Sequence, residues 1–255
     1  MKFLITGHKS GLGKYLHKYF GGSGLGRNTP PDKFEDIRRE GTDVIIHCAF
    51  NRAREVNSKN LYQYLFNNVF LTKKLVKIPH KKFIYISSVD VYPKDNKRYS
   101  EDEAIDVNQL SGVYAITKLM SESIIQTLCR NFLVLRCSTL LGRDSRENSL
   151  IKIIKEENPV LTLSPDSVFN YILHKDVLEF VKIATNKDLQ GVYNLVSSEN
   201  ISLFQIAELL GKKVNFGKYK YNVGNIDNRK ISSVAPVFAR TSEDTVREFI
   251  KEDLP

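Results

Sequence analysis

Short, uninterrupted apolar runs alternate with stretches of helical spacing over the first half of the chain. The apolar runs are Phe3-Leu4-Ile5 and residues 43–49, 82–88 and 132–136, and the helical stretches are residues 12–20, 32–40, 61–76 and 114–129. Strands that read as continuous apolar runs lie in a parallel sheet that is covered on both faces. The pattern therefore predicts an α/β fold, a doubly wound parallel sheet of the Rossmann type.

The spacing of apolar residues changes beyond Gly142. It predicts helices at residues 149–156, 176–185, 203–210 and 243–251, and a strand at residues 191–196. From Gly217 the chain is rich in turns and basic before the last helix. We therefore expect a dinucleotide-binding domain over residues 1–142. Residues 143–255 are expected to form a small mixed lobe that binds the substrate and is interleaved with the last strands of the sheet.

The first apolar run ends in a glycine turn, Thr6-Gly7-His8-Lys9-Ser10-Gly11-Leu12-Gly13, and a helical stretch follows. Gly7 permits a tight turn, Gly11 lets the backbone approach a pyrophosphate, and Gly13 allows the helix to pack closely on the strand. The spacing Gly-x-x-x-Gly-x-Gly differs from the common Gly-x-Gly-x-x-Gly, but the order of strand, turn and helix is the context that this fingerprint requires. The predicted dinucleotide-binding residues of this turn are Gly7, Lys9, Ser10, Gly11, Leu12 and Gly13.

The end of the second predicted strand, around Leu25, indicates which nicotinamide cofactor binds. A carboxylate at this place binds the ribose 2′-hydroxyl of NAD, whereas an arginine accommodates the 2′-phosphate of NADP. The chain has Arg27 and Asn28 here and no acidic residue from Gly21 to Pro31, and Lys9 is a second candidate cation. These residues favour NADP, with NAD as the alternative cofactor if Arg27 is only an exposed loop residue.

The charge and the cysteines argue against several other classes of protein, namely nucleic-acid-binding, disulfide-rich and metal-binding proteins. The formal net charge is +9, but the lysines are scattered, so we expect attraction to anionic metabolites and no nucleic-acid binding. Cys48, Cys129 and Cys137 form neither a disulfide framework nor a metal-binding spacing, so no metal site is expected. The chain begins without a signal-peptide core, and no run reaches the roughly 18 apolar residues of a membrane span. We therefore expect a cytoplasmic protein without membrane insertion.

Tyr114 and Lys118 are four residues apart on a predicted helix. That spacing puts both side chains on one helix face, where an ammonium group near a phenol favours the ionised oxygen. A tyrosine so placed can exchange a proton near neutral pH. Taken alone, the spacing is weak evidence and favours two exposed residues of a surface helix.

Several motifs occur together and in order. They are Thr6-Gly7-x-x-x-Gly11-x-Gly13, Asp43-Val44-Ile45-Ile46-His47-Cys48-Ala49, Ser87-Ser88-Val89-Asp90-Val91-Tyr92, Tyr114-x-x-x-Lys118, residues 135–142, residues 170–177 and Gly191-Val192-Tyr193-Asn194-Leu195. With these motifs the chain resembles the short-chain dehydrogenase/reductase superfamily, and most closely its extended branch, the NAD-dependent epimerase/dehydratase family that acts on nucleotide sugars. It departs from that family in its shorter length, its compressed second and third strands, and a glycine spacing typical of the shorter branch.

The resemblance implies a set of catalytic residues. They are Ser88, with Ser87 as a less favoured alternative, Tyr114 and Lys118. Ser88 would hydrogen-bond the substrate oxygen and Tyr114 would exchange its proton, while Lys118 would lower the pKa of Tyr114 and hold the nicotinamide ribose. The resemblance also places Cys48, Ala49, Phe50 and Asn68 beside the cofactor.

The resemblance is less specific for the substrate. Relatives that remove water from the sugar carry an acid one or two positions after the catalytic hydroxyl, where this chain has Asp90, although an aspartate that stabilises the turn before Pro93 is the alternative. Thr139 and Asn170 match positions that face the substrate. The predicted substrate-binding residues are Ser88, Asp90, Thr139, Arg143 and Asn170, and the arginines that are candidates to bind a pyrophosphate are Arg143, Arg146, Arg229 and Arg240.

These residues favour one activity within the family. The resemblance, together with Arg27, implies an NADPH-dependent oxidoreductase that reduces a keto group on a nucleotide-linked deoxysugar for surface polysaccharide synthesis. The alternatives are a nucleotide-sugar epimerase or 4,6-dehydratase with tightly bound NAD, and a non-catalytic cofactor-sensing or nucleic-acid-binding protein on the same fold. Relatives often dimerise through the helix that carries the tyrosine and lysine, so a homodimer through residues 114–129 is a further expectation.

Overall fold

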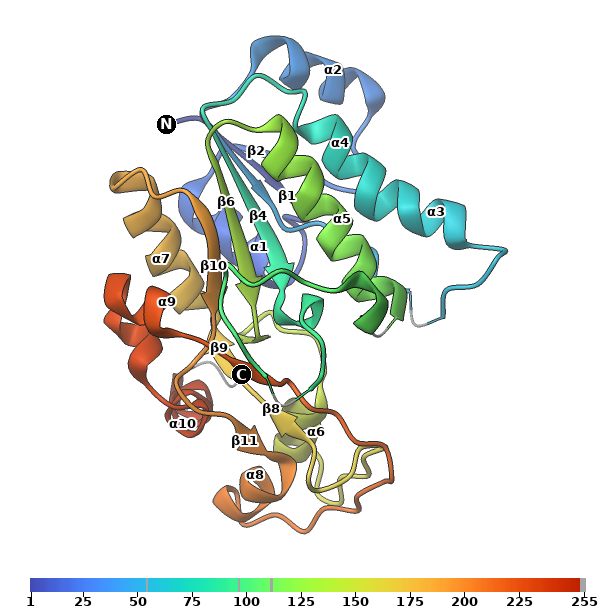
Figure 1. The fold of residues 1–255 in the computed structure, drawn as a ribbon, viewed down its shortest axis with the longest axis vertical. Coiled ribbons are helices and arrows are strands. Elements are labelled where there is room, and N and C mark those ends of the chain that lie inside the picture. Colours follow the sequence, from blue (N-terminus) through green and yellow to red (C-terminus); the bar gives the residue numbers. More distant parts are fainter. Residues whose placement is uncertain (54, 96, 111, 253–255) are drawn as a thin grey trace.

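The computed structural model describes the whole chain except residues 54, 96, 111 and 253–255. Its centre is a parallel sheet with the strand order β10-β6-β4-β3-β1-β2 (Figure 1). These strands are β1 (Phe3–Thr6), β2 (Ser23–Leu25), β3 (Val44–His47), β4 (Lys82–Ser88), β6 (Phe132–Cys137) and β10 (Gly191–Leu195). The predicted doubly wound parallel sheet is confirmed, and the prediction for β4 matches its observed bounds.

Neighbouring residues of each strand face opposite hydrophobic cores, which is why the strands read as continuous apolar runs. On one face, Ile5 of β1 packs with helices α1 (Gly11–Phe20) and α7 (His174–Asn186). On the other face, Leu4 packs with residues of α2 (Pro31–Glu40), α4 (Leu71–Leu75) and α5 (Gly112–Leu128). The helices therefore cover both sides of the sheet, as Figure 1 shows.

The order of the strands in the sheet reverses at β1. Strand β2 pairs with one edge of β1, and β3 pairs with the other. In open α/β sheets, ligands bind at the carboxyl ends of the strands where the order reverses in this way. Within the described residues, β2 is the only strand beyond β1 on its side, in line with the compression seen in the sequence. The loops after β1 and β3 are therefore the expected floor of a binding site.

The predicted helix over residues 61–76 contains a π-helical turn. The observed segments are α3 (Leu61–Leu65), a π-helix over Phe66–Phe70, and α4 (Leu71–Leu75). Such turns are rare and occur frequently at functional sites, because the wider turn frees backbone groups for other partners. Asn68 lies in the middle of this π-helix.

A second hydrophobic core lies in the C-terminal part of the chain. It is built by helices α6 (Ser149–Lys155), α8 (Leu203–Leu209) and α10 (Ser242–Glu252) with the short pairs β7 (Thr139–Leu141) and β9 (Tyr171–Leu173), and β8 (Val168–Phe169) and β11 (Ile201–Ser202). Helix α9 (Arg229–Val234) packs instead on the main core. The last strand of the main sheet, β10, also comes from this half of the chain.

A further short pair joins distant parts of the chain beside the main sheet. Strand β5 (Arg98–Tyr99) pairs in parallel with β12 (Asn225–Ile226). Strands of two or three residues carry no detectable period, which explains why these short pairs were not predicted.

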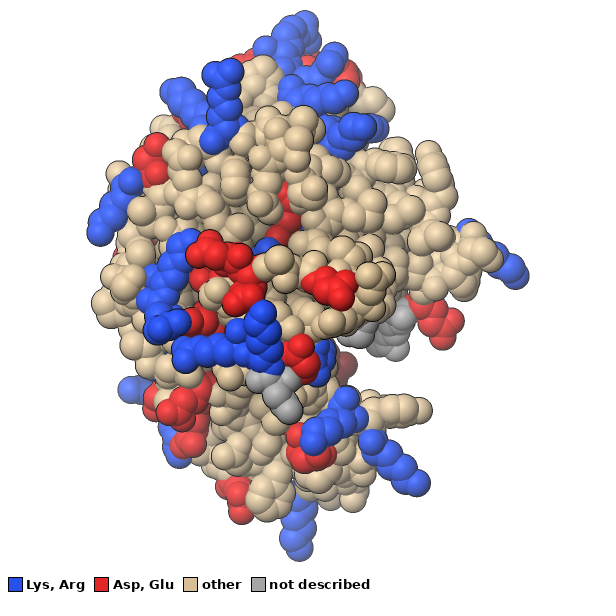
Figure 2. All heavy atoms as spheres, viewed as in Figure 1, with Lys and Arg blue, Asp and Glu red and all other residues tan. Residues whose placement is uncertain are grey.

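Lys and Arg side chains gather at the top of the face in Figure 2, over α2, and are interspersed with Asp and Glu elsewhere on this face. Among the helices that the structure describes, none combines the length and hydropathy needed to cross a membrane. The described residues also hold no group of three or more His, Cys, Asp or Glu side chains suited to bind a metal ion.

Candidate active site

A cleft of about 1800 Å³ opens at the carboxyl edge of the sheet. Its lining includes the loops after β1, β3, β4 and β6, the first turns of α5, and Tyr221 from the C-terminal part. Pockets for single small molecules measure roughly 300–1,000 Å³. The cleft is therefore large enough for a dinucleotide together with a substrate.

The glycine turn forms one wall of this cleft. Gly7 has a φ of 70°, in the left-handed region that favours glycine, and a side chain there would meet the Ala49 backbone nitrogen at 3.0 Å. A side chain at Gly13 would lie 2.4 Å from the Gly7 carbonyl oxygen, so glycine is needed for α1 to approach β1. The first turn of α1 has no acidic residue and faces the cleft, which suits a pyrophosphate at this helix N-terminus.

Cations line the end of the cleft beyond the glycine turn. Arg27, Asn28 and Lys9 all reach it, and neither Arg27 nor Lys9 has an ion-pair partner among the residues that the structure describes. Helix α2 adds Arg38 and Glu35, which form an ion pair with each other at 2.7 Å. The free positive charge at this end suits a phosphate group.

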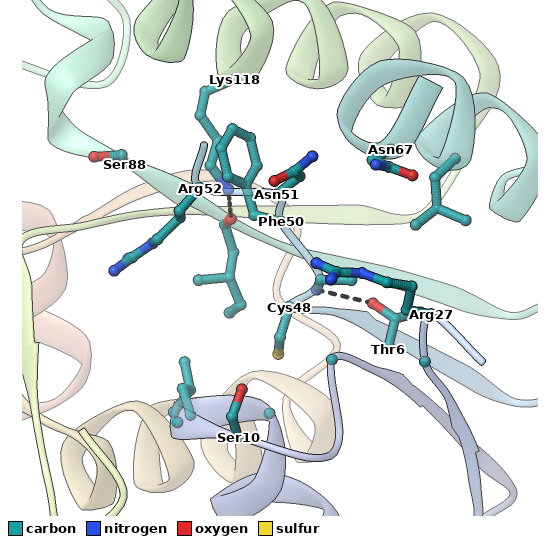
Figure 3. A pocket seen from close by; sticks show the side chains of 18 of the residues that line it. Thr6, Ser10, Arg27, Cys48, Phe50, Asn51, Arg52, Asn67, Ser88 and Lys118 are labelled. Carbon is teal, nitrogen blue, oxygen red and sulfur yellow. Dashed lines mark hydrogen bonds between the residues drawn. The ribbon is translucent and has the colours of Figure 1, made fainter. Parts of the chain in front are cut away.

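The predicted catalytic residues meet at the other end of the cleft. Ser88 is the last residue of β4, and Tyr114 and Lys118 lie one turn apart near the start of α5. All three line the cleft. In Figure 3, Ser88 and Arg52 lie toward one side of the cavity and Arg27 lies toward the other. The two ends of the predicted site are thus joined by one continuous cleft.

Lys118 is buried against two aromatic rings. Its Nζ donates a hydrogen bond to the Ile86 carbonyl oxygen at 2.7 Å and lies 4.4 Å and 4.8 Å from the ring centroids of Phe50 and Tyr85. Figure 3 shows the Phe50 ring directly against the end of Lys118. Burial, together with the positive charge of Arg52, lowers the pKa of Lys118 to about 7. Lys118 can therefore take up or release a proton near neutral pH.

Burial raises the pKa of Tyr114, and the nearby Ser88 hydroxyl and the charge of Arg52 oppose this effect. The largest opposing effects thus come from Ser88 and Arg52 rather than from Lys118, which is bonded to Ile86. Burial outweighs the two opposing effects, so the pKa of Tyr114 stays above that of a free tyrosine. The predicted role of Lys118 in lowering this pKa stays a prediction.

A buried chain of hydrogen bonds connects the glycine turn to the π-helix. The Ala49 amide donates to Thr6 Oγ1 at 3.0 Å, Thr6 Oγ1 lies 2.7 Å from His47 Nδ1, and His47 Nε2 lies 3.0 Å from Thr72 Oγ1. Because the Thr72 hydroxyl donates to the Asn68 carbonyl oxygen at 3.0 Å, His47 Nε2 carries the hydrogen and Nδ1 accepts from Thr6. Burial lowers the pKa of His47 to about 3, so the ring is neutral at pH 7. One ring nitrogen therefore donates and the other accepts, and the hydrogen bonds all run in one direction.

Asn68 holds the loop that follows β3. Its Oδ1 accepts from the Asn51 amide at 2.6 Å, and its Nδ2 donates to the Asn51 carbonyl oxygen at 3.1 Å. The Ser121 hydroxyl of α5 donates to the Asn68 carbonyl oxygen at 3.2 Å. Asn68 therefore positions the neighbours of Asn51, Phe50 and Arg52, which line the cleft, although Asn68 itself does not.

The structure brings most of the predicted residues to the cleft but leaves several outside. Besides the residues of the glycine turn, Arg27, Asn28, Cys48, Ala49, Phe50, Ser88, Asp90, Tyr114, Lys118, Thr139 and Arg146 line it. Asn68 and Asn170 are buried away from it, and Asn170 is engaged by the Ser197 backbone at 2.9 Å and 3.1 Å. Arg143 is exposed outside the cleft.

Two further arginines are engaged elsewhere, and the structure does not place them as pyrophosphate ligands. Arg229 pairs with Asp227, and Arg240 pairs with Asp176 and Glu248. Both guanidinium groups thus pair with carboxylates of the protein, and neither lines the cleft.

Some lining residues were not predicted. Arg52 follows the apolar run at residues 43–49, so its place after a strand end was a signal that the sequence carried. Arg38 and His174 lie on helices whose inner faces cannot be assigned from apolar spacing alone. Tyr221 lies in a turn-rich segment and contacts Asp90 across 131 residues, so no local pattern indicates it.

A parallel sheet whose first strand ends in a glycine turn, with Ser88, Tyr114 and Lys118 in one cleft, is typical of the short-chain dehydrogenase/reductase type. The model of the NAD dependent epimerase/dehydratase family matches residues 3–195. The chain belongs to this family.

Comparisons with individual proteins agree with this membership. A dTDP-D-glucose 4,6-dehydratase of Dictyostelium discoideum is 22% identical over 214 residues, which are 75% of this chain and 49% of that protein. The chain thus spans about half the length of the curated relative that it matches.

Solved structures of similar fold include enzymes with different activities. A dTDP-4-dehydrorhamnose reductase from Yersinia enterocolitica has a TM-score of 0.79 at 22% identity, with 98% of both chains covered. A UDP-glucuronic acid 4-epimerase from Bacillus cereus, solved with UDP-glucuronic acid and NAD, has a TM-score of 0.77 at 19% identity, with 99% of both chains covered. At these identities the likeness shows the fold, and the choice of reaction depends on the residues of the cleft.

Proposed function

We propose that the chain is an NADPH-dependent reductase that acts on a keto group of a nucleotide-linked deoxysugar. The observation that carries the proposal is that one cleft joins Ser88, Tyr114 and Lys118 to an end lined by the cations Arg27 and Lys9. A protonated phenol is the form that reduction requires, and a free arginine suits the 2′-phosphate of NADPH. The role in surface polysaccharide synthesis and the cytoplasmic location stay predictions.

The residues of the cleft suggest the proton-transfer steps. NADPH would supply the hydride when bound. Ser88 Oγ accepts from the Asp90 amide at 3.1 Å, so its own hydrogen is left to donate to the substrate carbonyl oxygen. Tyr114 gives its proton to that oxygen as negative charge develops there. Lys118, one helical turn along α5 and lining the same cleft, would return a proton to Tyr114 after each turnover.

The surroundings of Asp90 favour reduction over removal of water. Elimination from a sugar ring needs a group that transfers a proton to or from the ring. Asp90 is instead ion-paired with Lys94 at 2.8 Å and accepts a hydrogen bond from Tyr221 at 3.0 Å. A carboxylate engaged in this way is suited to accept hydrogen bonds from a substrate, and less suited to act as a general acid.

Replacing Arg27 by glutamine should change the cofactor preference. The KM for NADPH is expected to rise by about 10–100-fold, while the KM for NADH stays within about twofold, because hydrogen bonds to charged groups contribute about 1.5–3 kcal/mol. Arg39→Gln is the matched control, since Arg39 is an exposed arginine of the same region that pairs with Asp36 and lies outside the cleft. Equal losses with both cofactors in Arg27→Gln would contradict the assignment of Arg27 to the 2′-phosphate.

We also propose a homodimer through α5 and the neighbouring helix of residues 61–75. Tyr62 and Phe70 on that helix, and Met120 and Leu128 on α5, are 70%, 40%, 43% and 54% exposed. Figure 1 shows the two helices side by side on one flank of the sheet. Exposed large apolar side chains on adjoining helices are typical of an interface, and the resemblance to the family implies a second copy as the occupant.

Sedimentation velocity tests this interface. Met120→Glu should convert a dimer to a monomer at micromolar concentration, because a charge at the centre of an apolar interface is left without a partner. Phe204→Glu, at a 52% exposed phenylalanine on α8, is the matched control and should leave the dimer intact. A wild-type protein that sediments as a monomer would contradict the proposed interface.

A further inference from the structure

The imidazole ring of His8, in the glycine turn, lies directly against two glycines at the end of β2. A Cβ at Gly24 would lie 2.6 Å from His8 Cδ2 and from His8 Cγ, and a Cβ at Gly26 would lie 3.3 Å from His8 Cε1. The first distance is well inside van der Waals contact. The ring can therefore occupy this place only because residue 24 is glycine.

Packing holds the His8 ring in place. Its Nδ1 is buried and has no hydrogen-bond partner within the part of the chain that the structure describes. The ring of His17, on α1, lies 5.2 Å from the His8 ring between centroids, and His17 Nε2 lies 3.2 Å from the Gly22 carbonyl oxygen. His8 thus packs the glycine turn against both α1 and β2.

The turn after β2 follows a short edge strand. Strand β2 has three residues and pairs with β1 on one side. The Gly7 amide donates to the Leu25 carbonyl oxygen at 3.0 Å, and the Gly26 amide donates to Thr29 Oγ1 at 2.8 Å. A strand with one paired edge depends more on side-chain packing for its position. The His8 ring supplies such packing where the strand ends.

Lys9 and Arg27 meet at this turn. Lys9 follows His8 and Arg27 follows Gly26, and Lys9 Cε lies 3.9 Å from the position that a Cβ of Gly26 would take. Both side chains are exposed and line the cleft. Two cations held together repel each other, and each long side chain loses conformational entropy when it is held. A phosphate group bound by both cations would offset these costs.

We propose that His8 is a positioning residue for the cofactor. By packing against β2, His8 holds Lys9 and Arg27 together as one site for the 2′-phosphate of NADPH. This inference rests on the proposed use of NADPH and deepens it, because it assigns the preference to a packing contact behind both cations and not to Arg27 alone. His8 does not line the cleft, so it acts through its neighbours.

Titration of NADPH and NADH fluorescence isolates the contribution of the 2′-phosphate, because the two cofactors differ in this group alone. The wild type should bind NADPH at least about 10-fold more tightly than NADH, since hydrogen bonds to charged groups are strong. In His8→Ala the two cations are no longer held in advance, so NADPH should bind about 5–10-fold more weakly while NADH stays within about twofold.

Gly24→Ala tests the same contact from the other side. Its methyl group would displace the His8 ring, so it should weaken NADPH as His8→Ala does. Added to His8→Ala, it should cost less than about twofold more, because the space is then free. In a protein that already carries Lys9→Gln and Arg27→Gln, His8→Ala should likewise change NADPH binding by less than about twofold. A residue that supports only the fold would weaken both cofactors in every background.

His80→Ala is the matched control, since His80 is a half-buried histidine that packs on Phe83 outside the cleft, and it should bind both cofactors as the wild type does. Equal weakening of NADPH and NADH in His8→Ala would overturn the inference, because it indicates a role in the fold alone. Unchanged binding in both His8→Ala and Gly24→Ala would overturn it as well and would leave the proposed use of NADPH intact. A wild-type protein that does not prefer NADPH contradicts that proposed use itself, and the inference with it.

Discussion

Replacing Tyr114 by phenylalanine is expected to lower turnover by about 10²–10⁴-fold, the usual contribution of a positioned proton donor. The phenyl ring keeps its contact with Phe50, whose centroid lies 5.0 Å away, so the fold and the cleft are preserved. The affinity for NADPH should therefore change little. Steady-state rates at saturating NADPH, together with titration of NADPH fluorescence, measure the two quantities separately.

The outcome also tests the non-catalytic alternative. Tyr19→Phe, at an exposed tyrosine of α1, is the control and should leave both turnover and binding unchanged. If Tyr114→Phe retained wild-type turnover, Tyr114 would not be the proton donor. A biological role that survives loss of turnover would instead support a cofactor-sensing protein.

Replacing Arg136 by methionine is expected to destabilise the protein by about 3–5 kcal/mol, because it leaves the Glu122 carboxylate buried without its partner. Arg136 Nη2 donates to Glu122 Oε2 at 2.8 Å, and the two side chains are 5% and 0% exposed. Ser87 also donates to Glu122, at 2.5 Å, and Arg136 donates to the Tyr92 hydroxyl at 2.7 Å. This network therefore supports β4 and α5 directly behind the catalytic residues.

Urea unfolding at pH 7 measures this effect, provided that the slope of the transition is unchanged. The double variant Arg136→Met with Glu122→Leu should recover most of the loss, since no charge is then buried alone. The exposed pair Arg247 and Glu243, 59% and 52% exposed, gives the control: Arg247→Met should cost less than about 1 kcal/mol. An Arg136→Met protein as stable as the control would show that the buried pair is not a main support of the site.

The main sheet was predictable from the sequence because its strands are buried on both faces. Strand β4 was assigned with its observed bounds, and the alternation of Leu4 and Ile5 between two cores explains the unbroken apolar run of β1. The π-helix at residues 66–70 was not predictable, since a π-turn preserves an approximately helical spacing of apolar residues. The two-residue pairings of the C-terminal part depend on contacts between distant segments and leave no local pattern.

The site residues also divide into those that local sequence predicts and those that it does not. Glycines, catalytic residues and Arg27 follow strand ends or one helix face, and their positions could be inferred from spacing. Tyr221 could not, because its contact with Asp90 spans 131 residues. Asn170 and Asn68 matched positions near ligands, and in the structure both amides bond to other groups of the protein and lie outside the cleft lining. Sequence similarity locates such residues but does not determine which partner the side chain takes.

The central claim is tested most directly by measuring two quantities on one preparation of the protein: the nicotinamide cofactor that it carries and the NADPH that it consumes. The gently purified protein is analysed for bound cofactor by fluorescence and mass, and NADPH oxidation is then followed at about 340 nm with dTDP-4-dehydrorhamnose and other 4-keto nucleotide sugars. A reductase should carry no stoichiometric NAD and should consume one NADPH for each product molecule. One tightly bound NAD per chain, preferred over NADPH and unchanged after many turnovers, would contradict the reductase and favour an epimerase or dehydratase.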